Sequence, residues 1–250
     1  MIYQIQEMNR EDIARLATEA LAILPTASME QHGPHLPIKV DTALVGEVVR
    51  RAIPAIRIQR PVFVLPVLPY GHSDHHFSWA GALSLRTDTY LNVVRDISRS
   101  LIHQGTRRIL IVNGHGGNES LNGVAVMEAR TEHDVDMAAF SYWNFDRDAL
   151  IAAVNEGFGN VPGHAGDMET SCMLASHPGD VADDWRERVR QAIEAAKHDG
   201  GPRFAIGSPA GPRPLGFTDD SGNATPEIGK KLLDCTAAAM AEYINERFGP

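Results

Sequence analysis

Short apolar runs alternate with longer amphipathic segments along most of the chain, and this alternation limits the possible folds more than any other feature. Several of the apolar runs are bounded by Gly, Pro or Asn, and their length favours buried strands over helices; they cover residues 20–28, 62–70, 107–114 and 135–143. The segments between them have apolar residues at i, i+3, i+4 spacing and cover residues 41–56, 87–105 and 118–133. This alternation predicts an α/β fold with a mostly parallel sheet and helices on both faces.

Further helices are expected over residues 168–177, 181–198 and 225–247. Residues 200–226 are dense in Gly and Pro, which indicates a long loop of the kind that often has a functional role. The chain has no internal repeat, no low-complexity tail and no shift of composition that would mark a domain boundary. We therefore expect one domain over residues 1–250.

Charge and cysteine content exclude several classes of protein. The net charge of −9 argues against a nucleic-acid or anionic-membrane surface, because both require a basic patch. Two cysteines are too few for a disulfide framework, and they do not form a Cys-x-x-Cys pair. No segment approaches the roughly 18–20 apolar residues of a transmembrane helix, and the first residues lack the apolar core of an export signal. We expect a cytoplasmic protein with reduced thiols.

Histidine is the most informative residue in the composition. Seven of the eleven histidines lie in Gly-rich or Pro-rich stretches typical of loops: His32, His35, His72, His75, His76, His115 and His164. One such histidine taken alone usually fills or caps a polar loop, but the clustering points to chemistry.

The stretch SMEQHGPHLP follows the first predicted strand, where the carboxyl edge of the sheet opens. Residues two apart in extended backbone point to the same side, so Glu30 and His32 can converge on one point. Asp41 is expected to be the N-cap of the next helix, and a turn at Gly33-Pro34 could bring its carboxylate to the same place. These donors suit Zn²⁺, Mn²⁺ or Fe²⁺. The alternative is that Glu30 and His32 pair with each other while Asp41 only caps its helix.

A second stretch, ILIVNGHGGNES, contains the end of a predicted strand, then a Gly-rich loop, and then the start of a predicted helix. Open α/β sheets bind ligands at such strand ends. A phosphate-binding loop is one interpretation. The glycines do not follow Gly-x-Gly-x-x-Gly, however, and the loop has no basic residue, so His115 at its apex favours a metal ligand.

A third stretch, GHAGDMETS, places His164, Asp167 and Glu169 at the entrance to a predicted helix. The carboxylates could simply stabilise the positive end of the helix dipole. Together with His164, they could instead supply a further metal ligand and a general acid–base pair.

A fourth stretch, YGHSDHHFSWAGALSLR, has His75, His76 and Trp79 ahead of Gly81. An aromatic residue beside histidines in a loop that follows a strand suits a substrate wall. The alternative for Trp79 is a packing role.

These motifs together resemble the creatininase (creatinine amidohydrolase) family. The resemblance rests on Glu-Gln-His-Gly-Pro-His-Leu-Pro followed by an aspartate, on Asn-Gly-His-Gly-Gly-Asn, and on His-Ala-Gly-x-x-Glu-Thr-Ser, in the order of the family, and it runs from about residue 24 to residue 233. It implies a three-layer αβα fold, two divalent metal ions per subunit, hydrolysis of a non-peptide C–N bond in a small and often cyclic amide, and assembly as a homo-oligomer, commonly a hexamer. Zinc is the first expectation for the metals, with manganese or iron as alternatives.

The resemblance also implies a set of metal ligands. Glu30, Asp41 and His115 match the ligands of one metal, and His32 with the bridging Asp41 matches ligands of the second. Creatininases proper complete the second site with a glutamate at the position of Gly117, for which Glu169 is the obvious replacement here.

The resemblance and the loop motifs together give the remaining site residues. His164 matches a histidine that shuttles a proton, with Asp167 or Glu169 moving the proton or orienting the imidazole. His76, Trp79, Gly116 and Gly117 are assigned to substrate binding. His35 is expected to fix the orientation of a ligand. As a hypothesis, a hydroxide held between the two metals attacks the scissile carbonyl, and His164 protonates the departing nitrogen.

Two departures from the family pattern bear on the substrate. The usual Phe-Pro-Gly-Thr is replaced by Trp-Ala-Gly-Ala over residues 79–82, and Gly117 removes a hallmark of creatinine hydrolysis. Creatinine is therefore not the expected substrate. The family also includes a formamide hydrolase, a peptide-trimming enzyme of cofactor maturation, and hydrolases of cyclic sugar-derived ketones.

Other classes of function compete with this one. The same metal ligands could serve a lyase, or a hydrolase of C–C or lactone bonds, and a non-catalytic metal-binding protein would leave His164 without a role. A serine or cysteine hydrolase fits poorly, because no Gly-x-Ser-x-Gly is present and Cys172 lies inside a predicted helix.

Overall fold

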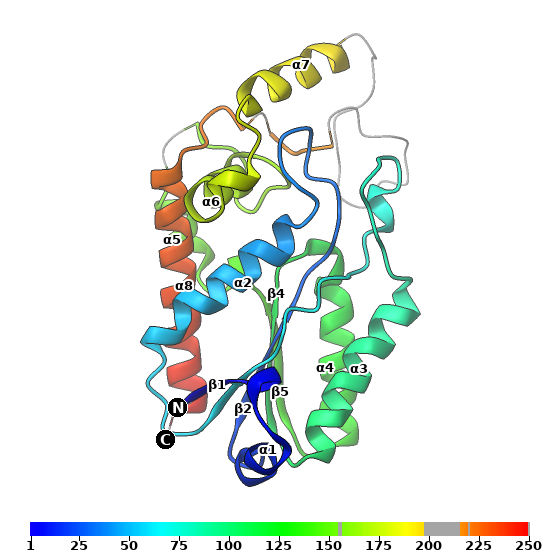
Figure 1. Ribbon diagram of the computed structural model, residues 1–250, viewed down its shortest axis with the longest axis vertical. Helices are drawn as coiled ribbons and strands as arrows, with labels where there is room; N and C mark the ends of the chain where they lie inside the picture. Colours follow the sequence, from blue (N-terminus) through cyan, green and yellow to red (C-terminus); the bar gives the residue numbers. More distant parts are fainter. Residues whose placement is uncertain (155–156, 198–215, 220, 250) are drawn as a thin grey trace.

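A parallel sheet forms the centre of the molecule (Figure 1). The computed structural model describes residues 1–154, 157–197, 216–219 and 221–249. The five strands lie in the order β1-β3-β2-β4-β5 and all pair in parallel. They are β1 (Ile2–Gln4), β2 (Leu21–Thr26), β3 (Val62–Val64), β4 (Arg108–Asn113) and β5 (Asp136–Ser141). The predicted α/β fold is confirmed.

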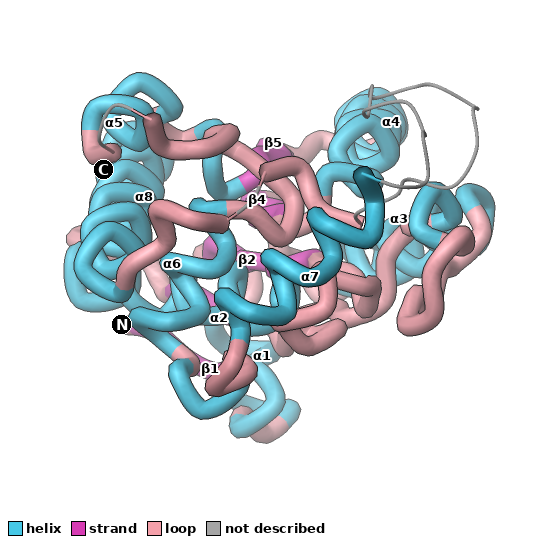
Figure 2. The backbone as a smooth tube through the Cα atoms, turned by 90° about the horizontal axis from the view of Figure 1, so that it is seen from above, coloured by secondary structure: helices cyan, strands magenta, loops and turns pink. Residues whose placement is uncertain are grey.

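Helices cover both faces of this sheet (Figures 1 and 2). One face packs against α2 (Val40–Ala52), α5 (Arg147–Ala152), α6 (Asp167–Ser176) and α8 (Pro226–Phe248). The other packs against α1 (Arg10–Leu16), α3 (Thr87–His103) and α4 (Glu119–Glu132). Helix α7 (Trp185–Lys197) lies beyond the carboxyl ends of the strands, at the top of Figure 1.

The alternation of side chains along the central strands produces two separate cores. In β2, Leu21 and Ile23 belong to the core beneath α2 and α8, whereas Ala22 and Leu24 belong to the core beneath α3 and α4. Such a strand must be apolar on both faces, which is why it appears in the sequence as a continuous apolar run.

The order of the strands places a topological switch point between β2 and β4. From β2 the chain passes through α2 to β3, toward the β1 side; from β4 it passes through α4 to β5, on the opposite side. Neighbouring parallel strands whose connections leave in opposite directions form the usual ligand-binding crevice of an open α/β sheet. Asn113 ties three strand ends together here, since its side-chain oxygen accepts from the Thr26 hydroxyl (3.1 Å) and its amide donates to Ser141 Oγ (2.9 Å).

Some elements differ from the sequence-based expectation. Strand β3 ends at Val64 instead of extending to residue 70, because Pro66 and Pro69 cannot donate backbone hydrogen bonds to a neighbouring strand. The short elements β1, α1 and α5 were not expected. Most of the predicted loop 200–226, residues 200–215 and 220, lies outside the described residues. None of the described helices has both the length and the apolar character needed to cross a membrane.

Candidate metal centre

The loop that joins β2 to α2 carries Glu30 and His32, and the first turn of α2 carries Asp41, all at the carboxyl ends of the strands. Gly33 takes a positive φ of 68°, a conformation that glycine adopts without strain, and the amide of Glu30 donates to the carbonyl of Ile38 (3.1 Å) to close the loop. Asp41 is not the N-cap that the sequence suggested. Lys39 occupies the cap position, and Asp41 is the second residue of α2 with its carboxylate directed at two histidines.

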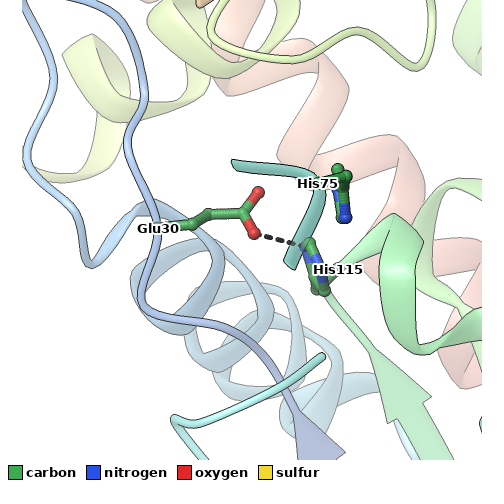
Figure 3. Close-up of side chains that lie close together, drawn as sticks. All are labelled: Glu30, His75 and His115. Atoms are coloured by element: carbon green, nitrogen blue, oxygen red, sulfur yellow. Dashed lines mark ion pairs between the residues drawn. The ribbon is translucent and has the colours of Figure 1, made fainter. Parts of the chain in front are cut away.

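A first donor set consists of Glu30, Asp41 and His115. His115 Nδ1 lies 3.1 Å from Glu30 Oε2 and 3.0 Å from Asp41 Oδ2, and all three residues are almost completely buried. Figure 3 shows the Glu30 carboxylate directed at His115, with His75 beside it. The exposed His75 ring stacks on that of His115, with ring centroids 5.6 Å apart.

A second donor set consists of His32, Asp41 and Glu169. His32 Nε2 lies 3.1 Å from Asp41 Oδ1 and 3.5 Å from Glu169 Oε2. Asp41 therefore presents one carboxylate oxygen to each set. Glu169 comes from α6, where its Oε2 accepts from the backbone amide of Ala165 (2.5 Å).

Backbone carbonyls determine which ring nitrogen of His32 and of His115 faces the donor sets. A carbonyl oxygen only accepts, so His32 must donate its Nδ1–H to the carbonyl of Glu30 (3.0 Å), and His115 must donate its Nε2–H to that of His72 (3.0 Å). In the neutral ring this leaves a lone pair on His32 Nε2 and on His115 Nδ1, the atoms that face the carboxylates.

The donor atoms fit divalent cations. Glu30 Oε2, His32 Nε2 and Asp41 Oδ2 are buried and have no hydrogen-bond partner among the described residues. Unpaired buried polar atoms are costly, so their convergence indicates that another group satisfies them. Carboxylate oxygen and imidazole nitrogen are the donors that Zn²⁺ and Mn²⁺ accept.

The electrostatics of the centre without metal support this interpretation. Burial alone would raise the pKa of Glu30, but the positive charges of His115 and His76 outweigh it and hold this pKa well below its usual range. Burial opposes charge on His115 as well, yet Glu30 and Asp41 raise its pKa to about 10. Protons on histidines thus balance the carboxylates, and bound cations would replace those protons.

His164 and His76 lie on the other side of Glu30. His76 Nε2 is 3.1 Å from Glu30 Oε1, and His164 Nδ1 is 3.6 Å from the same oxygen. Burial, with the positive charge of His32, holds the pKa of His164 well below its usual range. The backbone of His164 is fixed from both sides by Thr218, which accepts from its amide at Oγ1 and donates to its carbonyl, both at 2.8 Å.

Asp167 lies apart from this group. Its carboxylate accepts from the amides of Gly159 and Asn223, both at 2.8 Å, and no interaction links it to His164 in the described part of the chain. Residues two apart on a helix do not share a face, so Asp167 and Glu169 at the start of α6 point in different directions.

The remaining predicted positions surround the loop after β4. A Cβ on Gly117 would lie 2.2 Å from the carbonyl oxygen of His72 and 2.5 Å from His115 Nε2, whereas a Cβ on Gly116 would meet no atom within 4 Å. Trp79 is half-buried, and its Nε1 has no acceptor among the described residues.

Two further residues complete the surroundings of the centre. Gln31 contacts both His76 and His164, and it was not among the residues expected from the sequence. Alternation in an extended strand would direct it away from Glu30 and His32, so no simple signal marks it. His35 was expected to orient a ligand; instead it bonds through Nε2 to Thr170 Oγ1 (2.8 Å), next to Glu169.

Comparisons with known proteins extend these observations. The family model described as creatininase, creatinine amidohydrolase, matches residues 6–244. A creatinine amidohydrolase of Pseudomonas putida is 31% identical over 256 residues, covering 96% of this chain and 95% of that protein. A mycofactocin precursor peptide peptidase of Mycolicibacterium smegmatis is 32% identical over 218 residues, covering 85% of this chain and 79% of that protein.

Solved structures agree with the sequence comparisons. A structure titled creatininase Mn superimposes with a TM-score of 0.78 at 27% identity and covers 100% of both chains. A Zn–Zn type creatininase variant gives a TM-score of 0.79 at 28% identity and covers 98% of each chain. The buried His, Glu and Asp clusters of this chain resemble the metal site of these proteins.

Proposed function

Because this chain belongs to the creatininase family of metal-dependent hydrolases, we propose that it hydrolyses a non-peptide C–N bond in a small linear or cyclic amide. The observation that carries the proposal is the position of Asp41. Its two oxygens lie 3.1 Å from His32 Nε2 and 3.0 Å from His115 Nδ1, so one carboxylate joins two buried donor sets.

Two divalent cations would be held by the two sets, with zinc as the first expectation and manganese or iron as alternatives. Glu30, Asp41 and His115 would hold one; His32, Asp41 and Glu169 would hold the other. Such cations polarise a carbonyl and lower the pKa of a water from 15.7 to about 7, which supplies a nucleophile at neutral pH.

His164 is the proposed proton carrier for the leaving nitrogen. An imidazole whose pKa lies well below its usual range gives up an added proton readily. Glu169 shares the centre with it, and the Thr218 hydrogen bonds fix the position of the ring at the backbone. The open space beside Gly116 gives a substrate room to approach His115, with His76, Trp79 and Gly117 as neighbouring substrate contacts.

The substrate is proposed to be an amide other than creatinine. No side chain fits at Gly117 while His72 and His115 keep their positions, so this chain relies on Glu169 for the second set. Trimming of a small peptide is the second candidate, supported by the 32% identity to a mycofactocin precursor peptide peptidase. Hydrolysis of C–C or lactone bonds would use the same donors.

Metal analysis of Asp41→Ala tests the proposal. The parent protein, stripped with chelator and reloaded with Zn²⁺, should hold two ions per chain, and Asp41→Ala should lose both. Asp134→Ala removes an exposed aspartate in the α4–β5 connection and serves as the control. Unchanged metal content in Asp41→Ala would contradict the proposal. Turnover of creatinine, formamides, lactams, lactones and short peptides with added Zn²⁺ or Mn²⁺ then identifies the bond.

We also propose a homo-oligomer, by resemblance a hexamer. Exposed apolar side chains on the connection between β3 and α3, Tyr70, Phe77 and Leu83, provide a surface that self-association could cover. Light scattering after size exclusion tests this, and a monomer at micromolar concentration would contradict it.

A further inference from the structure

A single buried amide lies between two of the histidines beside Glu30. Gln31 is 7% exposed, and its Nε2 is 2.9 Å from His76 Nδ1 and 3.0 Å from His164 Nε2. A primary amide has two N–H groups, so it can donate to both rings at once.

The orientation of this amide follows from its other contact. Gln31 Oε1 lies 3.0 Å from the backbone nitrogen of Gly33, and a backbone N–H can only donate. Turning the amide over would set its NH₂ against that N–H and lose the bond. Gly216 packs against the same oxygen, since a Cβ there would lie 2.7 Å from Oε1. The NH₂ group must therefore face the two imidazoles.

This orientation assigns the protons on both rings. Since Gln31 donates to His76 Nδ1 and His164 Nε2, those nitrogens must carry lone pairs. In neutral rings the protons then lie on His76 Nε2 and His164 Nδ1. These are the nitrogens that face Glu30 Oε1, at 3.1 and 3.6 Å.

The same assignment separates four histidines into two kinds. His32 and His115 donate to backbone carbonyls and, as neutral rings, present bare nitrogens to the carboxylates. His76 and His164 accept from Gln31 and present N–H groups. A neutral imidazole binds a metal only through a bare nitrogen.

We infer that Gln31 is a positioning residue that fixes the proton on the Glu30-facing nitrogen of His76 and of His164, and thereby keeps both rings from binding metal. The statement about metal rests on the proposed function, whereas the proton positions do not. With Gln31 in place, His164 Nδ1 presents an N–H toward Glu30 Oε1, 3.6 Å away, even though the ring lies near Glu30 and His32.

Histidine-selective ¹⁵N labelling and two-bond ¹⁵N–¹H correlation spectra test this inference, in the metal-free and the Zn²⁺-loaded protein. His76→Gln and His164→Gln identify the two sets of signals. The parent protein should show His164 protonated at Nδ1 and His76 at Nε2. Gln31→Glu keeps the size and the acceptor for Gly33 but replaces the donor by an acceptor. It should therefore move protons onto His164 Nε2 and His76 Nδ1, with or without loss of the original proton.

Gln59→Glu, an exposed substitution of the same kind, should change neither pattern. Gln31→Met removes the donor without adding charge and should leave both rings as mixtures of the two tautomers. The inference is overturned if parent His164 is protonated at Nε2, or if Gln31→Glu and Gln31→Met both keep the parent pattern. Failure of the proposed metal centre would appear separately, as absence of bound Zn²⁺ in a protein whose metal-free spectra still show the assigned protons.

Discussion

Replacing Gly229 by alanine should destabilise the protein, although alanine is usually the better residue in a helix. Gly229 lies in the first turns of α8, where α8 crosses α6. A Cβ at this position would lie 1.8 Å from the carbonyl oxygen of Ser171 and 2.7 Å from the amide nitrogen of Cys172. Both atoms belong to the backbone of α6, so no side-chain rotation can relieve the overlap.

The expected change in the free energy of unfolding is the difference between two opposing effects. Gly→Ala inside a helix stabilises by up to about 1 kcal/mol. Overpacking a core usually costs about 1–3 kcal/mol, and ordinary contact here requires the two backbones to separate by more than about 1 Å, so the upper part of that range applies. The net loss should be about 2 kcal/mol, which lowers Tm by about 4–8 °C in a chain of this size.

Gly123→Ala is the matched control, because Gly123 lies in α4 and a Cβ there would meet no atom within 4 Å. Urea unfolding followed by circular dichroism should show a gain for Gly123→Ala and a loss for Gly229→Ala. The reasoning is refuted if the two variants are equally stable. Since α6 also supplies Glu169, zinc titration of folded Gly229→Ala should show weaker binding of one ion and little change in the other.

Two further predictions concern the donor sets. Gly117→Ala should weaken binding of one Zn²⁺ at least tenfold by forcing His115 to turn, and Gly116→Ala should not; equal affinities in a zinc titration would contradict the contact argument. In the metal-free protein, the free energy of unfolding should fall as pH rises. The pKa of His115 is raised from 6.5 to about 10, so its contribution is complete below 6.5 and lost as pH passes through about 10. The loss is at most about 1.4 kcal/mol per pH unit for one group. Urea titrations at pH 7 and 10 measure this loss of unfolding free energy. An equal loss in the zinc-loaded protein would argue against His115 as a metal ligand.

The fold was predictable because the strands that build it are apolar on both faces. Leu21–Thr26 and Arg108–Asn113 appear as apolar runs bounded by polar loops, and parallel pairing brings their carboxyl ends together. The proximity of His115 to Glu30 follows from that pairing alone.

Positions that depend on local direction were less predictable. The spacing placed Asp167 and Glu169 together with His164 at the entrance to a helix, but a helix directs the two carboxylates apart, and only Glu169 reaches the centre. Asp41 was expected to be the helix cap, but the helix begins at Val40 and its cap is Lys39. A shift of only two positions along the sequence separates these two assignments. The contacts of Gln31 arise from the turn at Gly33 and from Gly216, far away in the chain, and no local pattern reports them.

The two donor sets also differ in when the growing chain can complete them. Glu30, Asp41 and His115 all precede β5, so the ligands of the first set have all been synthesised before that strand. The second set waits for Glu169 on α6, which packs against α8 through Gly229 at the far end of the chain. Under the proposed function, only the second site therefore depends on a ligand synthesised after β5, although α2, which carries Asp41 of both sets, also packs against α8.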